Sequence, residues 1–519
     1  MKKASSFEIV AARCWNLLNE GKPFTPIFVV GTFALFRLDQ WTNGDFWLAA
    51  GLSLLLLLPL FAIYYYFDFP LLLRNYLWLP VVAALLVWEP PHNLSLYATA
   101  IGLYFFFTVF FWGTLYYRLR IGTTLWNFKR FWKLVLKNSD STSGNAQEQL
   151  PKLLLLLFLW NHLYIGIDLT GEGYLSSTHF SEAVVPLYLF IGCILLFAWI
   201  LHANLFDWKP KETAPLTESP DATGKAVNEK VIVIVVDGMR KERFEEADAP
   251  FLKKLRAEGT EYTQMETVYP ARTVVCFSSM FTGAYPKEHG IRSNMVWRLG
   301  IRVESIFDSL RKVNKKGRLL GIAHLIDSMG DDVESVTAVM HNDRADRNII
   351  ERAKKIMAEQ DPDLLVVQLI GVDQTGHSRG VLYDEYLQKI AEADRLIEEY
   401  VGWLNEQGMM RNTTLILCAD HGQADGIGGH GHLDEGERFV PFFLNGPTIK
   451  QGHRVDERHS LISMAPTLSF LLGAPYPNGS RGRVLSDAFK PQSKSGSGGK
   501  ETSNESKGTQ EISRIHSSA

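Results

Sequence analysis

The chain has 519 residues, of which 46% are hydrophobic and 21% charged, and its formal net charge is −3. This near-neutral balance argues against a basic nucleic-acid-binding protein and against a highly charged disordered chain. The apolar residues are concentrated in residues 1–207, whereas the rest of the chain has the composition of a charged globular domain. The four cysteines lie far apart and form no Cys-x-x-Cys pair, so the sequence predicts no disulfide framework.

Residues 1–207 contain six apolar stretches that approach the length of about 20 residues needed to span a bilayer. We therefore expect an N-terminal α-helical transmembrane bundle of about six helices. The first and third stretches are short and have Arg37 and Arg74 at their edges, so a re-entrant or interfacial position is the alternative for these two. The stretches are 23–38, 46–67, 76–88, 94–117, 153–170 and 183–206.

The distribution of Lys and Arg between these stretches predicts the orientation. Basic residues precede the first stretch, follow the sixth and fill the loop 118–152, whereas the alternate loops 39–45, 89–93 and 171–182 contain none. The positive-inside rule then predicts a cytoplasmic N-terminus, basic loop and C-terminal domain. We expect a multi-pass integral membrane protein, such as one of the bacterial inner membrane, with an extracytoplasmic catalytic domain as the alternative.

Polar and aromatic residues within this half suggest further roles. In the basic loop, Trp126, Phe128, Phe131 and Trp132 alternate with cations, which suits a helix lying on an anionic leaflet and makes membrane lipid an expected partner; a solvated charged loop is the alternative. Three polar residues fall in or near the fifth stretch, where either a functional site or helix-to-helix hydrogen bonding would explain them. They are Asn161, His162 and Asp168.

The C-terminal half is predicted to form an α/β domain over residues 230–489. A polar, proline-containing linker at 208–229 precedes it, and a Ser- and Gly-rich tail at 490–519 is predicted to be disordered. Helical patterns alternate with apolar, β-branched runs, which predicts a mainly parallel sheet sandwiched by helices. The expected strands are 230–236, 319–323, 363–370, 413–418 and 439–444, and the expected helices are 249–258, 303–313, 349–360 and 382–407.

Metal-ligating side chains follow three of the expected strands. Ligands in open α/β sheets bind beyond the carboxyl ends of the strands, so these side chains are expected to lie together. Mixed carboxylate and imidazole ligands suit zinc or a similar divalent ion, and their number suits two ions. The set is Asp237, Asp373, His377, Asp420, His421 and, in a Gly-Gly-His-Gly segment, His430.

This set resembles the alkaline phosphatase superfamily, and most closely its type I phosphodiesterase / nucleotide pyrophosphatase branch. The resemblance extends over roughly 230–487 and includes Tyr-Pro-Ala-Arg-Thr at 269–273, Thr-Gly-Ala-Tyr-Pro at 282–286 and Met-Ala-Pro-Thr-Leu at 464–468. It implies an alkaline phosphatase-like fold and two divalent metal ions, with zinc expected. It also implies that Thr273 is the nucleophile. Asp237, Asp420 and His421 would hold the metal that touches Thr273, and Asp373, His377 and His430 the second metal, with His432 as the alternative to His430.

Thr273 is also a plausible nucleophile on physical grounds. It opens the apolar helical stretch 274–281, so its hydroxyl would lie at a helix N-terminus, where an anion is favoured. Coordination to a metal would lower the pKa of the hydroxyl and generate an alkoxide. The alternative is that Thr273 is only an N-cap.

The segment after Thr273 departs from the family pattern. Phe-Pro-Asn-His is expected there, but the chain has Val-Val-Cys-Phe at 274–277, and Cys276 is a poor hydrogen-bond donor, so nucleotide specificity does not follow. Asn294 is the candidate to contact the substrate, with an ordinary turn residue as the alternative.

These features predict a membrane-anchored metal-dependent phosphodiesterase or phosphohydrolase that acts on a phosphate ester. The alternative is a transferase that passes a phospho-alcohol head group from a phospholipid donor, and a non-catalytic sensor is a third hypothesis. Nucleotide, lipid and phosphonate substrates remain open, as does the oligomeric state, and no nucleic-acid-binding surface is evident.

Overall fold

The computed structural model describes residues 10, 21–67, 75–88, 94–130, 132, 146–167, 180–201, 212, 214–217, 226–294, 296, 298–335, 342–425, 429–431 and 434–491. Much of the predicted basic loop, most of the predicted linker and nearly all of the predicted tail lie outside these residues. Asp168 and His432 also lie outside them.

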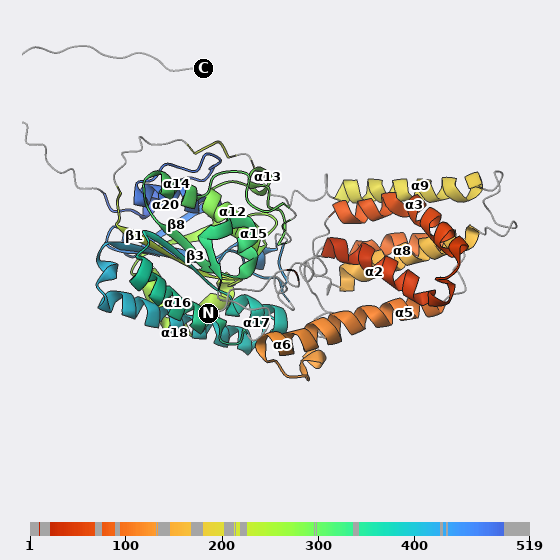
Figure 1. The fold of residues 1–519 in the computed structure, drawn as a ribbon, viewed down its shortest axis with the longest axis horizontal. Helices are drawn as coiled ribbons and strands as arrows, with labels where there is room; N and C mark the ends of the chain where they lie inside the picture. Colours follow the sequence, from red (N-terminus) through yellow and green to blue (C-terminus); the bar gives the residue numbers. More distant parts are fainter. Residues whose placement is uncertain are drawn as a thin grey trace, which may run out of the picture. The chain divides into compact units, whose positions relative to one another are not determined.

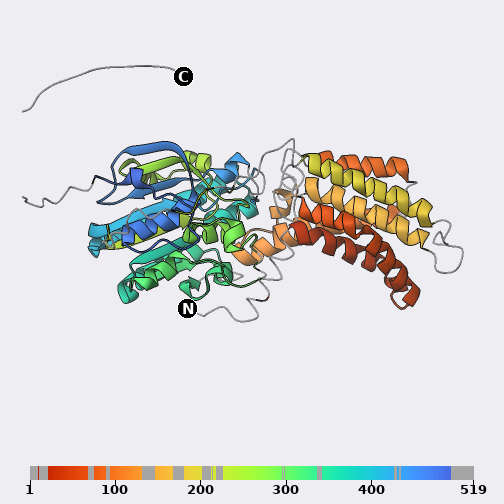
Figure 2. The same cartoon turned by 90° about the horizontal axis from the view of Figure 1, so that it is seen from above.

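The N-terminal half forms a bundle of helices around a central helix, α8 (Ala146–Gly166). The run from Leu153 to Leu159 in α8 is apolar on every side, and nearly all of these side chains are buried. A helix that is hydrophobic all round is stable only when it is surrounded, and α8 contacts α2, α3, α4 and α5. Figure 2 shows these helices side by side. The other described helices of this half are α2 (Gly21–Phe36), α3 (Gly44–Tyr66), α4 (Trp78–Val87), α5 (Leu94–Phe105), which continues into η3 (Phe106–Tyr116) and α6 (Tyr117–Ile121), and α9 (Phe180–Ile200), which contacts α3.

Two of these described helices are long and apolar enough to cross a membrane, as judged by length and composition alone. They are Gly44–Tyr66 and the continuous helix Leu94–Ile121. Shorter apolar helices cover Pro23–Phe36, Asn75–Val87 and Val184–Ile200. The residues predicted to form six spans are therefore helical where the structure describes them. Two of the described helices are long and apolar enough to be spans.

Two of the polar residues named for the fifth predicted span, Asn161 and His162, contact side chains outside α8. The guanidinium of Arg37, just after α2, donates a hydrogen bond to Asn161 Oδ1 on α8 over 2.5 Å and lies 4.3 Å from the centre of the Tyr164 ring. The ring of His162 lies 6.2 Å from that of Trp88. For Asn161, helix-to-helix hydrogen bonding is therefore the interpretation that the contacts favour.

The C-terminal half contains an eight-stranded sheet in the order β4-β3-β5-β1-β6-β7-β2-β8. Among these strands only β7 runs antiparallel to its neighbours. The central strands β1, β5 and β6 are buried along almost their whole length, as their apolar sequences predict. The strands are β1 (Lys230–Val236), β2 (Thr260–Glu266), β3 (Gly317–Gly321), β4 (Val333–Ser335), β5 (Leu364–Leu369), β6 (Thr413–Cys418), β7 (Phe442–Asn445) and β8 (His453–Ser460).

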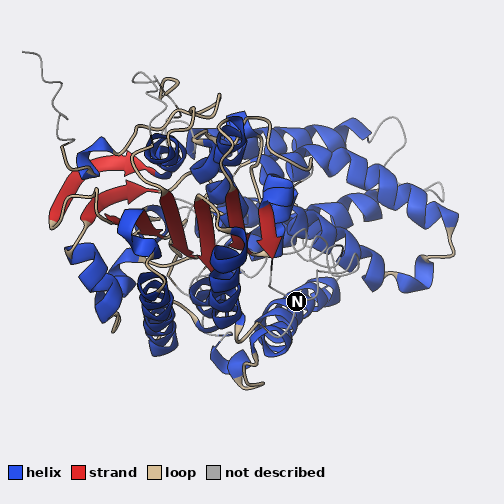
Figure 3. Ribbon diagram, turned by 60° about the vertical axis from the view of Figure 1, so that its left-hand side comes forward, coloured by secondary structure: helices blue, strands red, loops and turns tan. Residues whose placement is uncertain are grey.

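Helices cover both faces of this sheet, as predicted (Figures 1 and 3). One face is covered by α11 (Pro250–Ala257), α16 (Ala345–Gln360), α17 (Gly371–Arg379) and α18 (Asp384–Glu406), and the other by α12 (Thr273–Thr282), α14 (Ile306–Lys312) and α20 (Met464–Leu472). The predicted sandwich is therefore present.

Three strands were not predicted from the sequence, and neither were several helices of the α/β domain, among them α17 and α20. Strands β2, β4 and β8 lie at or near the two edges of the sheet, where one face and one backbone edge need no apolar cover. β8 is largely polar, and most of its side chains are exposed or half-buried. The helix α17 contains two glycines and several polar residues, so its sequence lacks the apolar repeat that marks a helix.

Candidate active site

Three neighbouring strands in the middle of the sheet place acidic side chains at one edge. β1 pairs in parallel with β5 on one side and with β6 on the other. Asp237 follows β1 directly, Asp420 follows β6, and Asp373 lies in the first turn of α17, just after β5. Since the carboxyl ends of parallel strands lie at the same edge of a sheet, these carboxylates converge there, as predicted.

The first group of side chains consists of Asp237, Asp420 and His421, all of them buried. His421 Nε2 lies 3.5 Å from Asp237 Oδ1 and 3.4 Å from Asp420 Oδ2. Neither of these two carboxylate oxygens has a hydrogen-bond partner. Buried oxygens without a donor are costly, so the pair fits a site for a cation.

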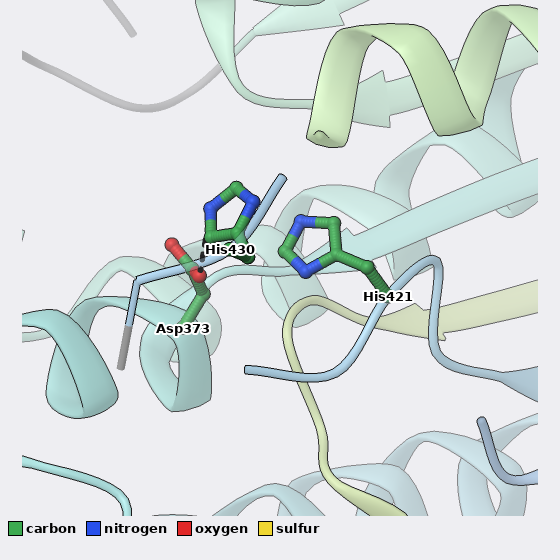
Figure 4. Close-up of side chains that lie close together, drawn as sticks. All are labelled: Asp373, His421 and His430. Atoms are coloured by element: carbon green, nitrogen blue, oxygen red, sulfur yellow. Dashed lines mark ion pairs between the residues drawn. The ribbon is translucent and has the colours of Figure 1, made fainter. Parts of the chain in front are cut away.

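The second group consists of Asp373, His421 and His430 (Figure 4). His430 Nε2 lies 3.7 Å from Asp373 Oδ1, and the rings of His421 and His430 stack with their centres 3.9 Å apart. His377 stands beside this group, one turn along α17 from Asp373, with its Nε2 3.3 Å from Asp373 Oδ1. His421 therefore belongs to both groups, and the two candidate metal positions are adjacent to each other.

Backbone carbonyls orient two of these imidazoles. His421 Nδ1 lies 2.8 Å from the carbonyl oxygen of Gly422, and His430 Nδ1 lies 2.7 Å from that of Ala271. A carbonyl oxygen only accepts hydrogen bonds, so each Nδ1 carries a proton, and in the neutral ring Nε2 then presents a lone pair toward the carboxylates. Lone pairs that converge with carboxylate oxygens form a donor set that fits a divalent cation such as zinc.

The pKa values of the carboxyl groups reflect this crowding. Burial raises the pKa of Asp237 well above its ordinary value, and the neighbouring Asp420 raises it further. Burial also raises the pKa of Asp420. Burial opposes the ionisation of Asp373 as well, but the neighbouring imidazoles of His377, His430 and His421 together outweigh it and hold the pKa of Asp373 below its ordinary value. A divalent cation between Asp237 and Asp420 would relieve their repulsion.

Thr273 lies next to His421, the residue that the two groups share. It is the first residue of α12, and its Oγ1 lies 3.1 Å from His421 Nε2. The N-cap of α12 is Arg272, whose side chain makes no capping hydrogen bond. Thr273 is therefore not the N-cap, and its hydroxyl faces the imidazole that both groups share.

The residues around Thr273 separate into two sets. Asn294 Oδ1 accepts a hydrogen bond from the backbone N–H of Val274 over 3.0 Å, so its side chain lies at the N-terminus of α12 next to Thr273. Cys276 is buried and contacts the Thr267 hydroxyl, with Sγ and Oγ1 3.2 Å apart. Ser278 bonds to the carbonyl of Val274 within the helix. Asn294 is thus near the candidate nucleophile, whereas Cys276 and Ser278 are engaged elsewhere.

Two glutamines that the sequence analysis missed support the carboxylates. Gln368 Nε2 donates to Asp237 Oδ2 over 2.7 Å, and Gln423 Nε2 donates to Asp373 Oδ1 over 2.5 Å. Gln368 is a polar residue inside the otherwise apolar strand β5, and this irregularity was a signal in the sequence. Partners of this kind fix the orientation of metal ligands.

Gly238 is expected to tolerate no side chain, because its backbone adopts φ +66° and a Cβ there would lie 2.8 Å from Asp373 Oδ1. Gly238→Ala should therefore displace the Asp373 carboxylate and weaken metal binding by about 10- to 100-fold, the range seen when the support of a ligand is lost. Metal affinity of the purified chain, measured by competition with a chelator, tests this.

Gly408→Ala is the matched control for this change. Gly408 also has a positive φ, of +71°, but a Cβ there would meet nothing within 4 Å. It should cost a similar amount of backbone strain and leave metal affinity unchanged. Equal metal affinity in the two variants would show that a side chain at position 238 does not disturb the Asp373 carboxylate.

Comparisons with known proteins cover the part of the chain that carries these residues. The sequence model of the family "Type I phosphodiesterase / nucleotide pyrophosphatase" matches residues 231–341 and 329–467. The catalytic subunit of human GPI ethanolamine phosphate transferase 3 is 30% identical over 180 residues, which are 34% of this chain and 15% of the relative. Mouse ectonucleotide pyrophosphatase/phosphodiesterase family member 1 is 24% identical over 238 residues, which are 42% of this chain and 26% of the relative.

A crystal structure of the alkaline phosphatase PafA aligns with a TM-score of 0.44 and 12% identity, and the alignment covers 51% of this chain and all of that one. The chain spans well under half of the length of the two curated relatives named above. All the candidate metal ligands and Thr273 fall within the residues that the family model matches. Over residues 231–467 the chain is therefore similar to the type I phosphodiesterase / nucleotide pyrophosphatase family.

Proposed function

We propose that the chain is a metal-dependent phosphodiesterase in which Thr273 is the nucleophile. The observation that carries the proposal is the position of the Thr273 hydroxyl, 3.1 Å from the imidazole of His421, which belongs to both candidate ligand groups. The match to the phosphodiesterase family model supports the same reaction class. Asp237, Asp420 and His421 would hold one divalent ion, and Asp373, His377 and His430 the other, with zinc expected.

The chemistry would proceed in two steps on Thr273. Two bound divalent ions would lower the pKa of the hydroxyl and neutralise charge on the phosphoryl oxygens. In the first step, Thr273 Oγ1 forms a bond to phosphorus, the bond from phosphorus to one alcohol oxygen breaks, and that alcohol leaves with a proton. In the second step, water attacks the same phosphorus, and Thr273 regains its proton as a phosphomonoester departs.

Asn294 would orient the substrate in this scheme. Its Oδ1 is used by the Val274 N–H, so its amide nitrogen is the group available to a phosphoryl oxygen at the start of α12. A helix N-terminus also favours an anion at this place.

A head-group transferase is the second candidate, and one observation favours it. Among the curated relatives are proteins named GPI ethanolamine phosphate transferases, from human and from Schizosaccharomyces pombe. The first step would be unchanged, and an acceptor alcohol would replace water in the second step. The phospho-alcohol head group of the donor would then be found bonded to the acceptor rather than free in solution.

Product analysis separates the two candidates. The purified full chain should release nitrophenol from bis(4-nitrophenyl) phosphate and lose this activity when a chelator strips the metal. With a phospholipid labelled in its head group, a hydrolase should yield free labelled phospho-alcohol in the absence of any acceptor. Label that leaves the lipid only when an acceptor alcohol is present, and is then found on that acceptor, would establish the transferase. No cleavage of either substrate would contradict both candidate functions.

We also propose that the N-terminal bundle anchors the enzyme in a membrane with the α/β domain on the cytoplasmic side. The basic residues before the first apolar stretch and in loop 118–152 support this orientation. The α/β domain should resist added protease in intact cells and become cleavable once the cells are lysed. Cleavage in intact cells would contradict the orientation.

A further inference from the structure

The segment Thr124–Arg130 forms one wall of a cationic cavity, and the end of α17 and Tyr383 contribute to the rest of its lining. The cavity measures about 380 Å³, and three cations line it: Lys129, Arg130 and, from the last turn of α17, Arg379. The aromatic rings of Trp126 and Tyr383 line it too. The ammonium of Lys129 lies 4.6 Å from the Trp126 ring, and the guanidinium of Arg130 lies 4.4 Å from the Tyr383 ring.

This cavity is held in place by a buried hydrogen-bond network. Asn127 is 3% exposed, and its amide nitrogen donates to the carbonyl of Gly113 over 2.8 Å and to that of Ser378 over 3.0 Å. Its Oδ1 accepts from Arg379 over 2.6 Å. Arg379 and Arg130 both donate to one oxygen of Glu385. The one carboxylate in this network faces two of the three cations, so the cavity keeps an excess of positive charge.

An apolar groove of about 1150 Å³ adjoins the cavity. Its walls are the α5 and η3 helices on one side and Phe128 and Trp132 on the other, with Phe105, Phe106 and Phe110 among the lining side chains. Lys129 lines both the groove and the cavity. The two hollows therefore meet at a cation, with hydrocarbon on one side and positive charge on the other.

We propose that this paired hollow binds an anionic membrane phospholipid, with its phosphate in the cationic cavity and an acyl chain in the apolar groove. Charge complementarity selects the occupant: cations attract a phosphate, aromatic rings accept the interfacial part of a lipid, and the phenylalanines accept its hydrocarbon. None of the proposed metal ligands lines either hollow, so this lipid is distinct from the reacting substrate.

The site is joined to the candidate active site through α17. Asp373 and His377 lie on this helix, and Ser378 and Arg379, which fasten the lipid cavity, follow them directly. A rise of about 1.5 Å per residue puts Arg379 roughly 9 Å along the helix axis from Asp373. The bound phospholipid therefore steadies the same helix that positions two candidate metal ligands.

The test is equilibrium binding of a phosphatidylglycerol with a fluorescent label on one acyl chain to the purified full chain in detergent. Phosphatidylcholine with the same labelled chain is the zwitterionic reference. The unmodified chain should bind phosphatidylglycerol at least about 10-fold more tightly. The double variant Lys129→Gln with Arg130→Gln should lose about 30-fold in affinity for phosphatidylglycerol and little for phosphatidylcholine.

Two further variants keep the result interpretable. Lys254→Gln with Arg454→Gln removes the same charge from two exposed side chains and should leave both affinities unchanged. Gly102→Phe places a large side chain in the groove from α5, where a Cβ meets nothing within 4 Å. It should lower the affinity for both lipids to the same extent. Equal affinity of the unmodified chain for the two lipids would overturn the proposal, as would equal losses in the two charge variants. The binding assay does not depend on turnover, so a chain that binds the lipid but cleaves no diester would contradict only the proposed function.

Discussion

Replacement of Thr273 by alanine is expected to lower kcat/KM for bis(4-nitrophenyl) phosphate by at least about 1000-fold, because the attacking oxygen is lost. The metal content should stay near that of the unmodified chain, since Thr273 is only one of several donors around the shared imidazole of His421. The measurement is steady-state turnover together with metal analysis of the same protein sample.

Two variants serve as controls for this result. Ser278→Ala removes a hydroxyl from the same helix, but that hydroxyl bonds to the Val274 carbonyl, so turnover should be nearly unchanged. Thr273→Ser keeps the oxygen and should keep a measurable part of the activity. Survival of normal turnover in Thr273→Ala would show that another group attacks the phosphorus.

Replacement of Asp420 by asparagine is expected to change metal binding and metal-free stability in opposite directions. Asp420 is fully buried beside Asp237, and its Oδ2 faces His421 Nε2 without a hydrogen-bond donor. The substitution removes a charged ligand, so metal affinity and turnover should each fall by more than about 100-fold. It also removes a repulsion between two buried carboxylates, so the metal-free variant should unfold at a temperature equal to or above that of the metal-free unmodified chain.

Thermal unfolding with and without added zinc measures both effects. The unmodified chain should gain stability on metal addition, whereas Asp420→Asn should gain little. Asp425→Asn makes the same chemical change at an exposed side chain and should behave like the unmodified chain. If the metal-free Asp420 variant is strongly destabilised, Asp420 serves the fold through its hydrogen bonds rather than a metal.

The middle of the sheet and the convergence of acidic residues could be predicted from the sequence. The strands β1, β5 and β6 are buried on both faces, so their runs of Val, Ile and Leu mark them without ambiguity. The polar residues at their ends then converge because the strands are parallel neighbours. The predicted bounds of β1 and β6 match those observed.

Other parts could not be predicted, since they depend on contacts between distant residues. The support of Asp373 by Gln423 joins positions far apart in the chain, and no local pattern marks it. The sharing of His421 between two groups depends on the distance between two strand ends, which the sequence does not give. The edge strand β8 is polar because it is half solvated, so its composition does not identify it as a strand.

The number of membrane spans could not be predicted from the sequence either. Apolar content alone does not distinguish a lipid-facing helix from one that other helices surround. The helix α8 is a case of the second kind, because its leucines are buried by its neighbours within the bundle.

The central claim is that Thr273 becomes covalently bonded to phosphorus during turnover. The most direct test is to mix the purified, metal-loaded chain with bis(4-nitrophenyl) phosphate, quench with acid during steady-state turnover and identify modified peptides by mass spectrometry. We predict the mass of one nitrophenyl phosphoryl group on the peptide that contains Thr273, and no such adduct in Thr273→Ala. An adduct on another residue would contradict the account.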